Sequence, residues 1–546
     1  MTASIRLALA LSSICIFANL VPAQDTTIVR APAGAVRGEA KADLRIFRGL
    51  PYAVPPTGPL RWKPPVAPPA WRNVRDATSF GPACFQPRPR AASIYADPPA
   101  EMSEDCLSLN IWTPADAHNA PVMVWIHGGS LTGGASSETL YDGSAIAMRG
   151  LVVVSINYRL GVLGYLAHPG LSSESPDGIS GNYGLLDQIE ALRWVKRNIT
   201  AFGGNPENVA IAGESAGALS VMYLMASPMA RGLFHKAILE SAYMISTPEL
   251  REKHFGEEPA EALGVRLATR LKVDSIAGLR GMDAAAITER APLTGYLPFG
   301  TIDGHVLRRQ LVDVFDRGEQ AHVPVLVGFN SGEIRSLRFL APPPPATEEA
   351  YVTAIRDRYG SLADAFLRLY PASDIPGSIL AEPRDALYGW TAERIATKQA
   401  AIGQHAFLYL FDHGYPAAEA AGLHAFHASE LPYIFGTADR TPPAWPKLPE
   451  TSEEKRFTEA MASYWTSFIR RGTPAAEGQP AWPSFAPGKA FMQLADAPRP
   501  GVNPLPGMYE LHEEVVCRRR AEGKTPWNWN GGIIAPPLPP ESPACR

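Results

Sequence analysis

The chain has 546 residues, of which 46% are hydrophobic and 19% are charged, a composition that supports a sizeable core and excludes disorder throughout. The 50 Lys and Arg residues nearly balance the 54 Asp and Glu residues, and the formal charge is −4. This balance argues against a general nucleic-acid binder or a binder of anionic membranes, because both need a basic surface.

The first two dozen residues are typical of a secretory signal peptide. Arg6 supplies the positive charge, residues 7–21 are mostly apolar, and small residues suit cleavage after Ala23. We therefore expect a leader over residues 1–23 and a secreted or periplasmic protein; a short buried helix is the alternative interpretation. No later stretch has the 18 or more apolar residues of a spanning helix, so no membrane span is expected.

Loss of the leader leaves four cysteines: Cys84, Cys106, Cys517 and Cys545. An even number in an oxidising compartment predicts two disulfides. Three pairings are possible, and the shortest loops join Cys84 to Cys106 and Cys517 to Cys545. Buried free thiols are the alternative. The sequence contains no C-x-x-C pair and no H-E-x-x-H motif, so no metal site is predicted.

Apolar runs of strand length recur along the chain after a loosely alternating stretch, residues 26–52, that predicts short hairpin strands. The runs are nearly continuous, as expected for strands covered on both faces. They are Val122–Ile126, Leu151–Ile156, Val209–Ala212, Ala237–Leu239, Val323–Val327 and Phe407–Phe411.

Helical patterns lie between these runs. Residues 185–192 place apolar side chains at i, i+4 and i+7, and residues 457–468 carry a wide apolar stripe. Thr451 and Glu454 predict a capping box at the start of the second helix, and Gly472 predicts its end. Strands that alternate with helices predict an α/β fold with a large, mainly parallel sheet and helices on both faces.

We expect one catalytic domain over residues 24–546. Two stretches, about 245–320 and 342–400, look helical without a clean strand order, and we interpret them as helical insertions that cover one end of the sheet. The tail from about residue 526 is rich in Pro and Gly and is expected to be an extended segment.

The most informative segment is Gly213-Glu214-Ser215-Ala216-Gly217. An apolar run leads into it and a helical pattern follows, which is the strand–turn–helix context that a G-x-S-x-G motif requires. Glycines are needed because the backbone at the serine is strained and larger side chains would clash. The turn would expose the Ser215 hydroxyl and place the Ala216 N–H at a helix N-terminus, where it can stabilise an oxyanion. A purely structural turn is the alternative.

A second glycine-rich turn follows the first of the apolar runs. There we expect the backbone N–H groups of Gly128, Gly129 and Ser130 to complete an oxyanion hole with Ala216, because glycines allow close approach to a substrate oxygen. Leu131 comes next and is expected to shape the substrate pocket. A glycine-rich turn without a catalytic role is the alternative.

Several long motifs make the sequence similar to the type-B carboxylesterase family, which includes cholinesterases, bacterial para-nitrobenzyl esterases and liver carboxylesterases. Residues 202–217 match the family's active-serine motif, and residues 104–110 match its cysteine motif except at Ser108. Shorter matching segments are residues 48–53, 60–65 and 157–161. The resemblance extends from about residue 27 to about residue 520. It implies an α/β-hydrolase fold with helical insertions over an active-site gorge, a Ser–Glu–His triad in chain order, and no metal or organic cofactor.

The resemblance also implies which residues complete the triad. Glu333 fits the family's acid motif, although Gly332 and Ile334 depart from the usual residues at their positions. His427 fits the base motif, because Leu-Pro-Tyr follows it at the expected spacing; His424, three residues earlier, is the alternative base.

Further residues are assigned by the same resemblance. Ser241 matches a family serine near the acid, and Glu214 is common across the family and is placed in the substrate-binding region. Cholinesterases hold choline against a tryptophan in the first disulfide loop. Between the first two mature cysteines this sequence has no Trp, only Phe85 and Tyr95, which argues against a cholinesterase.

The combined interpretation is a serine carboxylic-ester hydrolase that acts on small-molecule esters through an acyl-enzyme. An amidase or peptidase with the same triad, and a non-catalytic adhesion protein of cholinesterase-like fold, are the alternatives. The natural ester and the oligomeric state, monomer or homo-oligomer, stay open. Asn198 lies in an N-x-T sequon, and its glycosylation also stays open.

Overall fold

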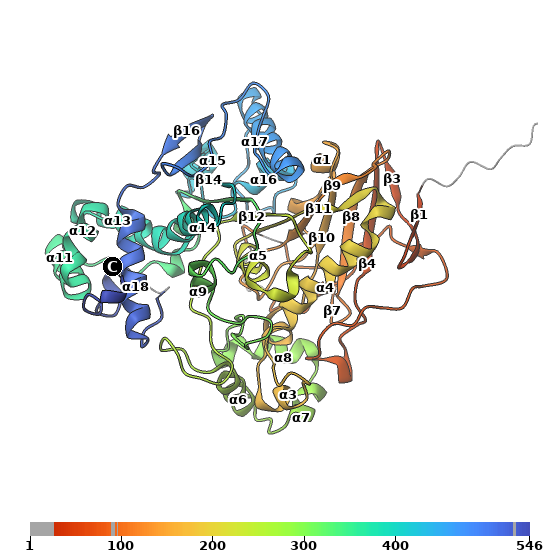
Figure 1. The fold of residues 1–546 in the computed structure, drawn as a ribbon, viewed down its shortest axis with the longest axis horizontal. Coiled ribbons are helices and arrows are strands. Elements are labelled where there is room, and N and C mark those ends of the chain that lie inside the picture. Colours follow the sequence, from red (N-terminus) through yellow and green to blue (C-terminus); the bar gives the residue numbers. More distant parts are fainter. Residues whose placement is uncertain (1–26, 89–92, 96, 528–530, 546) are drawn as a thin grey trace, which may run out of the picture.

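The computed structural model describes residues 27–88, 93–95, 97–527 and 531–545, and the expected leader and its cleavage site lie outside them. An 11-stranded sheet dominates this part of the chain (Figure 1). In spatial order its strands are β16 (Pro498–Val502), β15 (Ala490–Leu494), β14 (Ala406–Phe411), β13 (Val325–Asn330), β12 (Lys236–Glu240), β11 (Gly204–Glu214), β9 (Ala120–Ile126), β10 (Val152–Ile156), β8 (Ser108–Pro114), β4 (Leu44–Pro51) and β3 (Glu39–Lys41).

The strands from β15 to β10 are parallel to their neighbours, whereas β16 at one end and β8, β4 and β3 at the other pair antiparallel. The prediction of a mainly parallel sheet is confirmed, and each of the six apolar runs overlaps a strand. Two small sheets lie apart from it: β1 (Ile28–Ala31) with β2 (Gly34–Arg37) and β5 (Arg75–Asp76), and β6 (Ala83–Cys84) with β7 (Met102–Ser103).

Alternate residues of the central strands pack into two different cores. On one face of β9, Val122, Val124 and Ile126 pack with α4 (Tyr183–Asn198), α5 (Ala216–Ala226) and α14 (Trp390–Ala401). On the other face, Met123 and Trp125 pack with α1 (Ser144–Ala147), α16 (Leu431–Phe435) and α17 (Ser452–Arg471). Burial on both faces explains why these strands are continuous apolar runs in the sequence.

The remaining helices mostly lie in the two long connections that flank β13. Before it come α6 (Ala260–Leu271), α7 (Ile276–Gly281), α8 (Ala284–Arg290) and α9 (Leu311–Asp316); after it come α10 (Glu333–Ser336), α11 (Glu348–Tyr359), α12 (Ala363–Leu369) and α13 (Ile375–Arg384). The other short helices are α2 (Gly161–Tyr165), α3 (Pro169–Ser173) and α15 (Pro416–Ala420), and α18 (Met508–Glu522) is the last long helix. In Figure 1, α6 and α7 lie at the bottom and α11–α13 at the left.

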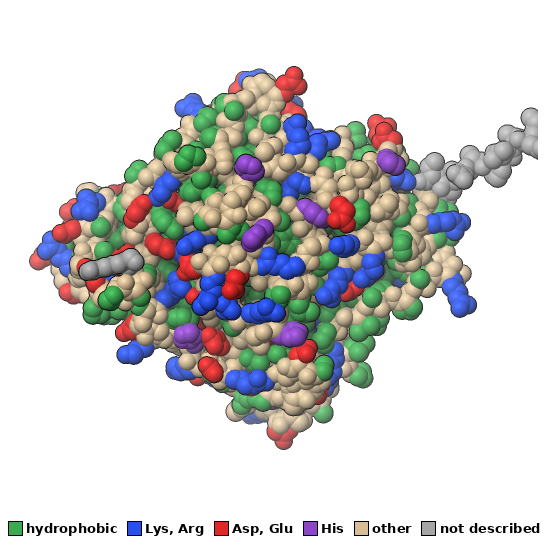
Figure 2. Space-filling model, viewed as in Figure 1, with side chains coloured by type: hydrophobic (Ala, Val, Ile, Leu, Met, Phe, Trp, Pro, Cys, Tyr) green, Lys and Arg blue, Asp and Glu red, His purple; other side chains and the backbone are tan. Residues whose placement is uncertain are grey.

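Helix α17 begins and ends where the sequence predicts. The Thr451 side chain accepts a hydrogen bond of 3.2 Å from the backbone N–H of Glu454, and Gly472 ends the helix in the left-handed conformation, with φ 75°. The surface seen in Figure 2 intersperses Lys and Arg with Asp and Glu, in keeping with the small formal charge.

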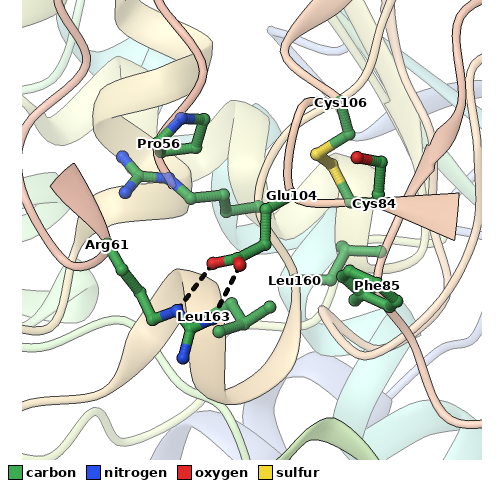
Figure 3. A pocket seen from close by; sticks show the side chains of 10 residues that line it. Pro56, Arg61, Cys84, Phe85, Glu104, Cys106, Leu160 and Leu163 are labelled. Atoms are coloured by element: carbon green, nitrogen blue, oxygen red, sulfur yellow. Dashed lines mark hydrogen bonds and ion pairs between the residues drawn. A yellow bond between two sulfur atoms is a disulfide. The ribbon is translucent and has the colours of Figure 1, made fainter. Parts of the chain in front are cut away.

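Two disulfides join Cys84 to Cys106 and Cys517 to Cys545. The second ties the 3₁₀ turn Pro543–Cys545 to α18. Beside the first disulfide, Arg61 and Glu104 form a bidentate ion pair at 2.7 and 2.6 Å (Figure 3). The cavity that they line measures about 10 Å³, which is too small for a substrate.

Asn198 is buried at the end of α4, and both atoms of its side-chain amide are hydrogen-bonded. The nitrogen donates to the carbonyl of Trp194, and the oxygen accepts from the N–H of Ala33, each at 2.9 Å. In the folded chain the Asn198 amide, the acceptor atom of this sequon, is therefore buried and already hydrogen-bonded. Within the described ranges, no helix combines the length and apolar character needed to cross a membrane.

Candidate active site

The serine of the G-x-S-x-G motif lies at the turn between β11 and α5. Ser215 has φ 56° and ψ −121°, a strained combination, and its N–H donates to the carbonyl of Glu240 at 2.9 Å. A Cβ atom at Gly217 would lie 2.1 Å from the carbonyl oxygen of Ile126, and one at Gly213 would lie 2.5 Å from the Gly217 carbonyl carbon. Both glycines are therefore required for the turn to pack against β9.

The turn after β9 lies directly against this serine. A Cβ atom at Gly128 would be only 3.3 Å from the Cβ of Ser215. Gly129, Ser130 and Leu131 follow with positive φ of 100°, 57° and 58°. In the described ranges, the backbone N–H groups of Gly128, Gly129 and Ser130, and that of Ala216, donate no backbone hydrogen bond. Two loops that meet at Ser215 thus carry N–H groups without a backbone acceptor among the described residues.

The predicted acid and base meet because two distant loops pair. Gly332 forms a parallel bridge with Phe426, which sets Glu333, the first residue of α10, beside His427. His427 Nδ1 is hydrogen-bonded to Glu333 Oε2. Both residues are buried, with 5% of His427 and 0% of Glu333 exposed. This contact fixes the orientation of the ring, with Nδ1 donating its proton to the carboxylate.

The second oxygen of the Glu333 carboxylate is held by two further donors. The backbone N–H of Asn330 reaches Oε1 at 2.8 Å, and the Ser241 hydroxyl donates to it at 2.6 Å. Ser241 follows β12, next to the strand that leads to Glu333. The structure therefore brings Ser241 to the acid, where its hydrogen bond keeps the carboxylate oriented.

On its other side, the imidazole faces Glu214. His427 Nε2 lies 3.0 Å from Glu214 Oε1, whereas no hydrogen bond to the Ser215 hydroxyl occurs among the described residues. Burial lowers the pKa of His427, but the facing carboxylates of Glu214 and Glu333 raise it, and the net result is a pKa well above the ordinary value.

His424 occupies a different environment. It pairs with Glu419 through Nδ1 and with Asp412 through Nε2, the latter at 3.0 Å, and it is partly exposed. Neither of these partners is Glu333, which is hydrogen-bonded to His427 instead. The geometry therefore favours His427 over His424 as the histidine of the site.

Aromatic rings enclose the imidazole. The Tyr95 ring is 6.1 Å from His427 in an edge-on arrangement, and the Tyr388 ring is 5.4 Å away. The Tyr95 hydroxyl donates to Ser336 in α10 at 2.7 Å, which ties the first disulfide loop to the helix that carries Glu333. Leu131 is buried next to the oxyanion turn.

Sequence reasoning missed Tyr388 and Asn330. Tyr388 lies in a π-helical turn, Asp385–Gly389, inside the second helical stretch, and π turns leave no clear periodic signal.

Besides its backbone contact with Glu333, Asn330 donates from its side-chain amide to Glu430 Oε2 at 2.5 Å. Burial and the carboxylates of Glu214 and Glu333 raise the pKa of Glu430 to about 8.

Comparison with known proteins gives a consistent result. The carboxylesterase family profile matches residues 25–364 and 378–504. Fumonisin B1 esterase of Sphingopyxis macrogoltabida is 38% identical over 482 residues, which cover 84% of this chain and 85% of that protein. Para-nitrobenzyl esterase of Bacillus subtilis is 35% identical over 465 residues, 84% of this chain and 92% of that protein.

Solved structures agree with this assignment. A PNB esterase structure superposes with a TM-score of 0.76 at 31% identity, covering 89% of this chain and 99% of that chain. A carboxylesterase of Geobacillus stearothermophilus superposes with a TM-score of 0.71 at 33% identity and the same coverage. The chain therefore belongs to the carboxylesterase family, has the α/β-hydrolase fold and is a type-B serine carboxylesterase.

Proposed function

We propose that this chain is a secreted carboxylic-ester hydrolase in which Ser215, His427 and Glu333 form the catalytic triad. The proposed mature protein is a single domain over residues 24–546 after loss of the leader. The observation that carries the proposal is that three segments meet at one place. The loop at Gly128 lies against the strained serine, and His427, which is hydrogen-bonded to Glu333, contacts Glu214, the residue before that serine. Two disulfides support an oxidising compartment.

In the acylation step, neutral His427 accepts the proton of Ser215 through Nε2 while the serine oxygen attacks the ester carbonyl. Nε2 must turn from Glu214 toward the serine for this transfer. The movement is short because both side chains lie beside Gly128, where a Cβ atom would be 3.0 Å from Glu214 Oε2 and 3.3 Å from Ser215 Cβ. Glu333 holds Nδ1 and stabilises the imidazolium that forms.

The negative charge that develops on the carbonyl oxygen lies within reach of the unpaired N–H groups of Gly128, Gly129, Ser130 and Ala216. Each such donor contributes about 3 kcal/mol to transition-state stabilisation. His427 then gives its proton to the departing alcohol, and the same residue activates water to release the acid from the acyl-enzyme.

Glu214, Tyr95 and Tyr388 lie against His427, and Leu131 is buried next to the oxyanion turn. We propose that these four side chains contact the ester. Relatives carry names that refer to different esters, fumonisin B1, para-nitrobenzyl esters and cocaine among them. The proposed substrate class is accordingly a small-molecule carboxylic ester rather than one named compound.

The test is turnover of p-nitrophenyl acetate and butyrate beside the matching p-nitroanilides, followed by labelling with a fluorophosphonate and peptide mass spectrometry. We expect rapid ester turnover, little anilide turnover and one label on Ser215. Comparable turnover of the anilides would indicate an amidase. A folded protein that turns over neither and takes no label would contradict the catalytic proposal.

The facing carboxylates predict a particular pH dependence. His427 acts as the base only when neutral, so kcat/KM rises as the pH rises through its pKa, which the carboxylates hold above the ordinary value. Replacing Glu214 by Gln removes one of the two charges that raise this pKa. We expect the acidic limb of the kcat/KM profile to move to lower pH by about one unit.

The matched control is Glu454→Gln. Glu454 also faces a buried histidine, His413, with 3.1 Å between Oε1 and Nε2, but lies on α17 away from the serine. This variant is expected to keep the wild-type acidic limb. An unchanged limb in Glu214→Gln, or an equal displacement in both variants, would show that Glu214 does not set the pKa of the base.

A further inference from the structure

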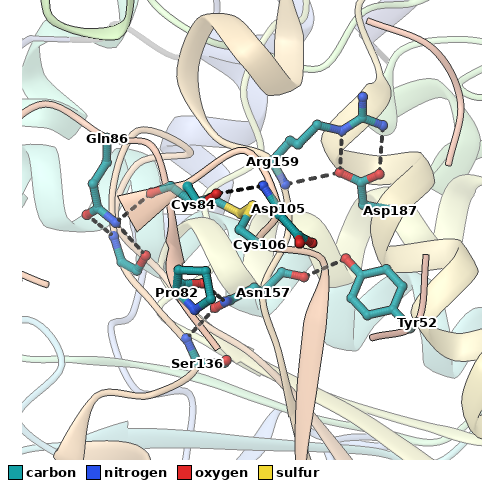
Figure 4. The surroundings of a disulfide bond; sticks show 12 residues. Tyr52, Pro82, Cys84, Gln86, Asp105, Cys106, Ser136, Asn157, Arg159 and Asp187 are labelled. Atoms are coloured by element: carbon teal, nitrogen blue, oxygen red, sulfur yellow. Dashed lines mark hydrogen bonds and ion pairs between the residues drawn. A yellow bond between two sulfur atoms is a disulfide. The ribbon is translucent and has the colours of Figure 1, made fainter. Parts of the chain in front are cut away.

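The first disulfide loop begins beside the proposed oxyanion hole, and one buried glutamine joins the two. Gln86 lies two residues after Cys84. Its amide nitrogen donates to the carbonyl of Gly134 at 3.0 Å, and its amide oxygen accepts from the N–H of Gly134 at 2.9 Å. The amide nitrogen also donates to the carbonyl of Cys84 at a longer distance, 3.3 Å, and Figure 4 shows the contacts that leave the Gln86 amide. One side chain thus satisfies both backbone groups of one residue.

Gly134 in turn packs onto the oxyanion loop. A Cβ atom at Gly134 would lie 2.4 Å from His127 Nδ1 and 2.8 Å from the carbonyl oxygen of Gly128. Hydrogen bonds also hold the turn between Gly129 and Gly134. The carbonyl of Gly129 accepts from the N–H groups of Thr132 and Gly133, each at 2.9 Å. A shift of Gly134 would therefore also move the backbone N–H groups of Gly128 and Gly129.

The loop needs such a tie because its own sequence gives it little rigidity. Gly128, Gly129, Gly133 and Gly134 all lack side chains, and glycine has the widest conformational freedom. Without Gln86, the N–H and carbonyl of Gly134 lose the partners that the described residues provide for them. Leaving both groups unpaired favours a rearranged turn.

We infer that Gln86 is a positioning residue for the oxyanion hole: its paired hydrogen bonds to Gly134 hold the turn in the geometry that aims the Gly128 and Gly129 N–H groups at the oxyanion. This role rests on the proposed esterase function. Because these donors contact the oxygen most strongly in the transition state, loss of their alignment lowers kcat more than it raises KM.

The decisive variant is Gln86→Leu, which keeps a side chain of similar size and removes both hydrogen bonds to Gly134 together with the longer one to the Cys84 carbonyl. For p-nitrophenyl butyrate we expect kcat to fall by about 10- to 100-fold and KM to change by less than about threefold. A trifluoromethyl ketone, whose serine adduct carries an oxyanion, is expected to bind more weakly by a factor similar to the loss in kcat.

The chain offers a matched control at Gln310. Its buried amide makes the same two bonds to a single residue, accepting from the N–H of Thr247 at 2.9 Å and donating to its carbonyl at 2.8 Å, ahead of α9. Gln310→Leu carries a comparable structural cost and is expected to keep the wild-type kcat and ketone affinity. Thermal unfolding of both variants gives the size of that cost.

If the leucine variant does not fold, Gln86→Glu replaces it as the test. This variant keeps an acceptor for the Gly134 N–H and removes the donor to the Gly134 carbonyl. Its kcat is expected to fall as well. Wild-type kcat and ketone affinity in a folded Gln86 variant would overturn the inference, as would equal kcat losses at Gln86 and Gln310. Failure of the esterase proposal is distinguishable, because the wild-type protein itself would then lack ester turnover and the Ser215 label.

Discussion

Replacing Ser215 by alanine is expected to lower kcat for p-nitrophenyl butyrate by about four orders of magnitude or more while the protein stays folded. The variant removes the atom that forms the acyl-enzyme, and water attacking directly does not replace it. The fold is kept because alanine has the same Cβ atom at φ 56° and retains the N–H that donates to the Glu240 carbonyl.

The measurement is kcat together with the thermal unfolding midpoint. A suitable control is Ser220→Ala, a buried serine on the same helix whose hydroxyl accepts from the Gln188 amide at 3.0 Å. It is expected to keep activity within a few-fold of wild type. If Ser215→Ala kept even a tenth of the wild-type kcat, the serine would not be the nucleophile.

The second large effect is expected at the base. His427→Gln should lower kcat by about 10⁴-fold, because neither proton transfer nor the imidazolium is then available. The neighbouring His424→Gln is the matched comparison, since that ring is hydrogen-bonded to Glu419 and Asp412 and not to Glu333 among the described residues. We expect His424→Gln to keep nearly full kcat and to change the unfolding midpoint modestly.

This pair of variants also tests the register of the base motif. The assignment of His427 depends on its hydrogen bond to Glu333, which His424 lacks. A large loss of kcat in His424→Gln with a small loss in His427→Gln would reverse the assignment and place the acid elsewhere.

Much of the fold could be predicted because its centre is unusually regular. Strands β9 to β14 are buried on both faces, so they appear in the sequence as apolar runs. The strands at the ends of the sheet had no such signal. In β8, Asn110 and Thr113 are polar yet buried, and β16 contains Pro498 and Pro500 and has exposed residues. These features hide a strand from a search for apolar runs.

Some residues of the candidate site could likewise be predicted from the sequence, and others could not. Ser215 was identifiable because its motif needs a particular backbone, and Glu333 and His427 were identifiable only through resemblance, since an isolated glutamate or histidine carries no local signal. Gln86 had no signal at all. Its importance arises from hydrogen bonds to Gly134, 48 residues away, and no periodic pattern records a pairing of that kind.

The close contact between the serine turn and strand β9 fixes the position of both loops of the site. Gly217 packs against the carbonyl of Ile126, the last residue of β9, and β9 leads directly into the turn at Gly128. The end of one central strand, β9, therefore positions both loops that form the proposed oxyanion hole. The helices between β12 and β14 take no part in that spacing. Apart from α10, which carries Glu333, these helices can diverge in sequence and so change which esters enter, while the reaction chemistry is inherited intact.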